Sequence, residues 1–163
     1  MAIKLEKKKE ICKKVQDIVN NHPTVVFVNF HGLSVVDATQ LKTSLRKEDA
    51  YYLVAKKSLV KRVLGETKVE GELPQLDGEL ALAYGQDQIA PARGVFEFQK
   101  KHKNNIAILG GIFEGIFVDK DKMSSIAQIP SLQILRGQLV NVINSPLQGL
   151  VIALDQIAKQ KQV

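Results

Sequence analysis

Four basic residues within a seven-residue stretch are the most informative group of side chains in this sequence. They are Lys56, Lys57, Lys61 and Arg62, and spacings of four and five residues bring them to one side of a helix. Bound phosphates would relieve their mutual repulsion, and the release of counterions would add affinity. A solvated helix face is the alternative, because such repulsion costs only about a few tenths of a kcal/mol. The cluster favours contact with a nucleic acid.

Two weaker features point the same way. Lysines near the N-terminus, including Lys7 and Lys8, form a second basic group that neighbouring glutamates partly offset. The segment from His31 to Ser34 contains Gly32 at a predicted junction between strand and helix, where backbone N–H groups can face a phosphate. A tight turn also needs Gly for its geometry alone, so both interpretations stay open.

Catalytic and metal-binding groups do not assemble from this sequence. The three histidines, His22, His31 and His102, lie far apart and lack nearby Cys or paired carboxylates at ligand spacing. Asp119 and Asp121 alternate with lysines, which indicates a charged surface turn rather than a cation site. We therefore expect no enzymatic activity, no metal, no cofactor and no small-molecule substrate.

Composition and charge agree with a polyanionic partner. The chain has 163 residues, of which 45% are hydrophobic and 25% charged, with a net charge of +6. Basic residues concentrate in segments 1–14 and 42–62, whereas segment 66–87 is acidic, so we expect a basic side and an acidic side. The lone Cys12 indicates a reducing, cytoplasmic location and a small core residue. No run of about 18 apolar residues occurs, so neither export nor membrane insertion is expected.

The apolar pattern predicts the elements that must position the basic residues. Helices are predicted over 3–20, from Ser34 to about residue 47, over 58–64 with Leu59 and Val63 facing inward, and over 89–102. Strands are predicted over 24–30, 51–55, 79–84 and 106–109, with 112–118 continuing the edge of the sheet. Gly65 is predicted to end the short helix, 65–78 to be a loop, Gly110-Gly111 to mark a bulge or turn, and 119–122 to be a turn.

The order of these elements predicts an α+β fold. Without the insertion at 57–78 it is the split βαβ, ferredoxin-like (α-β plait) arrangement, with an N-terminal helix in addition. Right-handed crossovers would place both connecting helices on one face of an antiparallel sheet. We expect this domain to span residues 1–130 and a helical tail to span residues 131–163.

The tail is apolar at the end of the chain, where frayed polar residues are common. We expect one helix, a break at Asn144-Ser145-Pro146, and then a terminal helix. The terminal helix either folds back on the domain or binds partner helices. Its apolar residues form two similar triplets seven residues apart: Leu147, Leu150 and Val151, then Leu154, Ile157 and Ala158.

Several motifs together resemble the bacterial large-subunit ribosomal protein ten family. They are His31-Gly32-Leu33-Ser34, Leu41-Lys42 with Arg46, the segment from Tyr51 to Arg62, Gly78 before an apolar strand, Ala127 to Ser131, and Ser145 to Leu150. The likeness covers essentially the whole chain, and residues 54–62 are its most specific part. His31, Lys42 and Lys57 stand where the family usually has Arg, Arg and Asn.

The resemblance implies a structural protein at the base of the ribosomal stalk. It implies that the α/β domain binds large-subunit rRNA beside ribosomal protein eleven, and that the terminal helix carries dimers of the acidic stalk protein seven/twelve. The rRNA-binding residues would be Lys7, Lys8, His31, Gly32, Lys42, Arg46, Lys56, Lys57, Ser58, Lys61 and Arg62.

Two other functions fit a ferredoxin-like domain. An acylphosphatase-type enzyme would need an Arg-bearing phosphate loop and a positioned Asn, and neither follows the first predicted strand. A small-ligand regulatory domain would be expected to lack the basic helix and the apolar tail.

Overall fold

The computed structural model describes residues 5–67, 69–71, 74, 76, 78–101 and 105–161, apart from the side chains of Leu5, Lys7 and Lys161. His102 lies outside these residues, as do Lys4, Lys68, Glu72 and Asp77, which contributed to the predicted charge segments. The chain divides into two compact units, residues 1–129 and 130–163.

The first unit is an α+β structure, as predicted. In chain order its elements are α1 (Leu5–Asn21), β1 (Thr24–Phe30), α2 (Val35–Lys47), β2 (Ala50–Val54), α3 (Lys57–Glu66), β3 (Leu80–Gly85), α4 (Ala90–Lys101), β4 (Ile106–Phe113), β5 (Ile116–Asp119) and α5 (Lys120–Ala127). The described strands form a five-stranded sheet in the order β2-β3-β1-β4-β5, and each neighbouring pair is antiparallel. Its first four strands have the ferredoxin-like order, and β5 adds one more at the edge.

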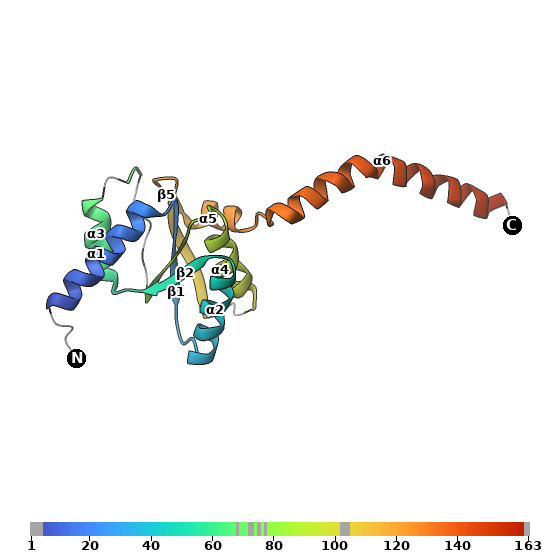
Figure 1. The fold of residues 1–163 in the computed structure, drawn as a ribbon. Coiled ribbons are helices and arrows are strands. Elements are labelled where there is room, and N and C mark those ends of the chain that lie inside the picture. Colours follow the sequence, from blue (N-terminus) through green and yellow to red (C-terminus); the bar gives the residue numbers. More distant parts are fainter. Residues whose placement is uncertain are drawn as a thin grey trace. The chain divides into compact units, whose positions relative to one another are not determined.

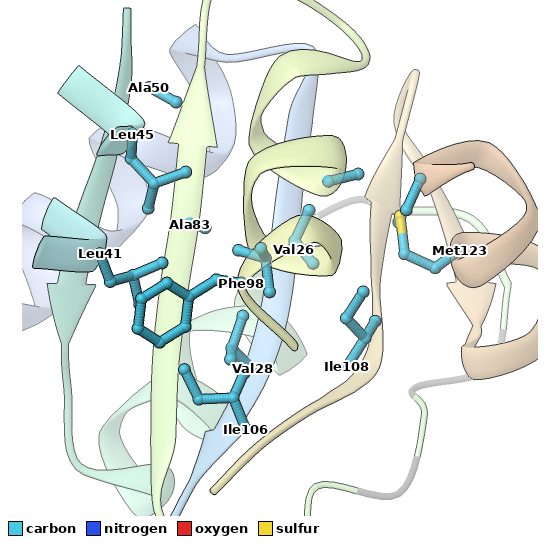
Figure 2. Close-up of a cluster of buried hydrophobic side chains, with 13 residues drawn as sticks. Val26, Val28, Leu41, Leu45, Ala50, Ala83, Phe98, Ile106, Ile108 and Met123 are labelled. Atoms are coloured by element: carbon cyan, nitrogen blue, oxygen red, sulfur yellow. The ribbon is translucent and has the colours of Figure 1, made fainter. Parts of the chain in front are cut away.

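Helices cover both faces of the sheet (Figure 1). Val26 and Val28 of β1 face one buried cluster, which contains side chains from α2, α4 and α5. Figure 2 shows this cluster, with Leu41 of α2 beside Phe98 of α4. Val25 and Phe27 face the other cluster, with α1 and α3. The predicted placement of both connecting helices on one face is confirmed, and burial on both faces explains why residues 25–28 of β1 are all apolar.

A β-bulge explains the Gly110-Gly111 pair. Phe27 lies opposite Gly110 but Val28 lies opposite Ile108, so the register shifts at this point. Gly110 has a φ of +140°, which side chains rarely adopt. Of the two predicted geometries, the bulge is therefore correct, and β4 continues through it to Phe113.

Three predictions about where helices begin or end were wrong. Residues 120–122 begin a helix, α5, because Asp119 at the end of β5 caps it and Met123 and Ala127 become buried one turn apart. Gly65 lies inside α3, which ends at Glu66. The expected break at Asn144-Ser145-Pro146 is absent, and one helix, α6, runs over Leu132–Lys161 with Pro146 inside it. Pro146 cannot donate to the carbonyl four residues earlier, but on this exposed helix water can satisfy that carbonyl.

Candidate nucleic-acid interface

Strand directions bring distant segments of the sequence to one end of the sheet. Because β1 and β2 are both antiparallel to β3, they run in the same direction, and their last residues, Phe30 and Val54, lie at the end where β3 begins with Leu80. We call residues 30–34, 54–58 and 78–80 the basic end of the sheet. The turn at Gly32 and the start of α3 both belong to it.

Of the three cations predicted to face outward on α3, Lys61 and Arg62 do so, whereas Lys57 is half-buried. Lys61 and Arg62 are exposed, while Val60, Val63 and Leu64 are buried. The predicted inward pair was Leu59 and Val63, but Leu59 is only half-buried, because the buried face follows residues 60, 63 and 64. The apolar side of α3 therefore packs on the sheet and leaves the two exposed cations facing outward, where a partner can reach them.

The start of α3 has the character of an anion site. Lys56 is the N-cap residue and is exposed, and no side chain caps the helix within the described residues. Ser58 is exposed and Lys57 half-buried in the first turn. An uncapped helix N-terminus carries partial positive charge, which adds to that of the lysines.

The turn from His31 to Ser34 is held in a defined conformation. The backbone N–H of His31 donates to the carbonyl oxygen of Asn105 at 2.9 Å, and the Asn105 side chain donates to the carbonyl oxygen of Gly32 at 3.0 Å. Gly32 has a φ of +61°, and a Cβ there would meet no atom within 4 Å, so Gly is needed for conformation rather than space. Ser34 then caps α2 by accepting from the N–H of Asp37 at 3.1 Å. The exposed His31 and Gly32 are thus fixed beside the start of α2.

The predicted basic residues divide between the two layers of helices. Lys42 and Arg46 are exposed on α2, which covers one face of the sheet. The cations of α3 and the exposed Lys8 of α1 belong to the layer on the other face. Lys7 also belongs to α1, but its side chain is outside the described set. A single flat phosphate-binding face cannot include all of them, because Lys42 and Arg46 lie in the later part of α2, which leads to the opposite end of the sheet.

A cavity of about 500 Å³ opens at the basic end of the sheet. Its lining combines Ile11 of α1 with Phe30, Val54, Ala55, Lys56, Lys57, Gly78, Glu79 and Leu80. The two lysines were predicted from the sequence as binding residues, but the apolar walls were not. The available signal in the sequence was Val54, an apolar residue near the end of a predicted strand and close to the lysines. In the structure it lies on an edge strand and is 51% exposed.

The predicted partner-binding residues all lie exposed on α6. Leu147, Leu150, Val151, Leu154, Ile157 and Ala158 are exposed, and the first five are 51–64% accessible. Seven-residue spacing on a continuous helix returns each triplet to nearly the same side. α6 therefore presents two similar apolar surfaces after Pro146.

Neither a metal site nor a membrane span is found in the part of the chain that the structure describes. No group of three or more His, Cys, Asp or Glu side chains could hold a metal ion there. None of its helices combines the length and the hydropathy that crossing a bilayer requires.

Comparison with known proteins identifies a family. The family model described as ribosomal protein L10 matches residues 3–100. A protein of Shouchella clausii named "Large ribosomal subunit protein uL10" is 32% identical over 99% of this chain and 98% of its own length. A protein of the same name from Rhodospirillum rubrum is 32% identical over 86% of this chain and 81% of its own length. Another from Carboxydothermus hydrogenoformans is 30% identical over 96% of this chain and 96% of its own length.

Proposed function

We propose that this protein forms the base of the ribosomal stalk. The chain belongs to the ribosomal protein L10 family, so it is a structural protein of the large ribosomal subunit and not an enzyme. Residues 1–130 bind large-subunit rRNA beside ribosomal protein eleven. Residues 131–163 anchor dimers of the acidic stalk protein seven/twelve, which recruit translational GTPases. The protein is a structural component of the cytoplasmic ribosome. Its family membership argues against an acylphosphatase-type enzyme, because a shared fold alone does not imply that activity.

The observation that carries the rRNA assignment is the position of the α3 cations beside the fixed turn at Gly32, because the start of this helix and the turn lie at one end of the sheet. Lys56 occupies the N-cap position of α3, Lys61 and Arg62 project from this helix, and the fixed turn at Gly32 lies at the same end of the sheet as its start. Cations on a rigid scaffold can contact a folded RNA without first being ordered. Lys42 and Arg46 on α2 extend the contact along the other helical layer.

The stalk assignment is supported by the composition of α6. Apolar side chains of a solvent-exposed helix cost free energy unless a partner covers them, and amphipathic partner helices cover such surfaces efficiently. The two triplets after Pro146 suit two dimers. Lys159, near the end of the helix, forms an ion pair with Asp155 at 2.7 Å and would exchange this carboxylate for one of an acidic partner. The exposed Leu135 and Leu139 lie before Pro146 and outside the triplets.

The rRNA assignment is tested by replacing Lys61 and Arg62 together with Ala. Binding to isolated large-subunit rRNA should weaken, and the slope of log affinity against log salt should flatten by roughly 0.7–0.9 for each phosphate that the variant no longer binds. The matched control replaces Lys120 and Lys122, two exposed lysines of α5, which packs beside β4 and β5 at the other edge of the sheet (Figure 1). Equal affinity and equal slope in wild type and the α3 variant would show that α3 is not the binding face.

A further inference from the structure

We propose that the cavity at the basic end of the sheet receives one unstacked nucleobase of the bound RNA. This rests on the proposed rRNA binding and adds to it a defined subsite and the form of the ligand. The phosphate contacts proposed above fix the position of the RNA, whereas a pocket for a single base would select single-stranded or bulged RNA over a regular duplex.

The volume and lining of the cavity suit a base. Its volume of about 500 Å³ falls within the range of ~300–1,000 Å³ that is usual for small-ligand sites. Ile11, Val54 and Leu80 contribute aliphatic surface, and Phe30 borders the cavity at the end of β1 while its side chain packs against the cluster on the other face of the sheet. A base has two apolar faces, and stacking of a base on apolar and aromatic side chains is a common means of binding unpaired RNA.

The charges at the cavity favour a nucleotide over an apolar protein side chain. Lys56 and Lys57 belong to the lining, and the N-terminus of α3 begins between them. Lys8, three residues before Ile11 on α1, is exposed on the same side of that helix as this wall residue. Cations beside an apolar floor match a phosphate attached to a base, whereas an apolar side chain would gain nothing from them.

Glu79 is the acidic residue of the lining, and it restricts the choice of base. Its carboxylate only accepts hydrogen bonds, so it cannot assist a phosphate. It can accept from the exocyclic amino group of cytosine, adenine or guanine. The pocket is therefore expected to prefer a base that carries an amino group.

Two substitutions at equally exposed positions distinguish a loss of binding in the cavity from a general effect of added negative charge. Val54→Glu places a carboxylate in the cavity wall, on edge strand β2. Ile116→Glu makes the same change in charge on edge strand β5, and both native side chains are 51% exposed. Thermal unfolding of the two variants checks that both are folded.

The full-length chain is titrated with isolated large-subunit rRNA, and short-wavelength ultraviolet crosslinking with mass spectrometry locates nucleotide adducts. We expect V54E to weaken binding by about tenfold, within the range for the loss of one stacked base, and I116E to bind as wild type. Adducts in the wild-type chain should fall on Phe30 or on residues 54–57, and should disappear from these positions in V54E.

Several outcomes would overturn the proposal. If V54E and I116E bind rRNA equally well while the Lys61 and Arg62 variant binds weakly, the subsite is wrong and the proposed rRNA binding stands. If the Lys61 and Arg62 variant also binds as wild type, the proposed binding face itself fails. Normal rRNA binding by V54E together with loss of another ribosomal protein from the complex would make the cavity a protein-docking site. If V54E does not fold, adducts in the wild-type chain found only outside the cavity would refute the proposal.

Discussion

Tyr52 shows how the burial of one side chain changes the dependence of stability on pH. It lies on β2 and packs against the cluster formed with α2 and α4, and burial raises its pKa to about 12. Its hydroxyl has no hydrogen-bond partner within the described residues. The unfolded chain releases this proton near pH 10, before the folded chain does, so the stabilisation is complete below pH 10 and is lost as the pH rises towards 12.

We expect Tyr52→Phe to weaken this decline in stability. Near neutral pH the variant should be as stable as wild type or up to about 1 kcal/mol more stable, because it removes an unpaired buried hydroxyl. Tyr84, whose pKa is raised chiefly by burial and also by Tyr51, keeps its own contribution to the decline. Urea unfolding between about pH 8 and 11 measures the effect. An identical decline in variant and wild type would contradict this account of Tyr52.

Individual site residues differed in how far the sequence could place them. Exposure of Lys61 and Arg62 followed from helical spacing, because a short helix on a sheet has one apolar face. The walls of the cavity did not follow, because Ile11, Phe30 and Leu80 come from three elements that only the strand order brings together. Pattern within a segment predicts exposure, whereas a cavity depends on contacts between segments.

Elements with strong periodicity were predicted well, and weak ones were not. β1 and β3 are mostly apolar and are bounded by turn residues, so their sequences indicated strands. α5 has only Met123 and Ala127 as buried residues, and the alternating charges of residues 119–122 concealed this spacing. Pro146 indicated a helix end because Pro usually ends helices, but a solvated helix can continue through the missing hydrogen bond.

Pro146 should still divide α6 into two parts of different stability. Gly137 and Gly149 lie on either side of it, and a Cβ at either position would meet no atom within 4 Å. Replacing Gly149 by Ala should stabilise the helix locally by close to 1 kcal/mol and slow amide exchange about fivefold in residues 147–161.

Gly137→Ala is the matched substitution for the first part of the helix. It should slow exchange in residues 132–145 and have a smaller effect beyond Pro146, since the hydrogen-bond ladder is interrupted there. Hydrogen exchange followed by mass spectrometry resolves the two segments. Equal protection of both segments by either variant would show that α6 is one cooperative helix, and the proposed division would be incorrect.

On the scale of the whole molecule, the two compact units match the two proposed tasks. The first unit has its own core on both faces of the sheet, so it has the packing of an independent domain. The second is a 30-residue helix with exposed apolar side chains, which favours stabilisation through partners. The proposed rRNA and stalk surfaces are therefore expected to be separable.

The central claim, that one chain joins rRNA to stalk dimers through separate surfaces, is tested most directly by native mass spectrometry. The full chain and a chain lacking residues 146–163 are each mixed with large-subunit rRNA fragments and the acidic stalk protein. We predict that the full chain carries rRNA and about two dimers, one for each apolar triplet, and that the shortened chain keeps rRNA but no dimer. Three or more dimers on the full chain would refute the stoichiometry, and undiminished dimer binding by the shortened chain would contradict the role assigned to α6.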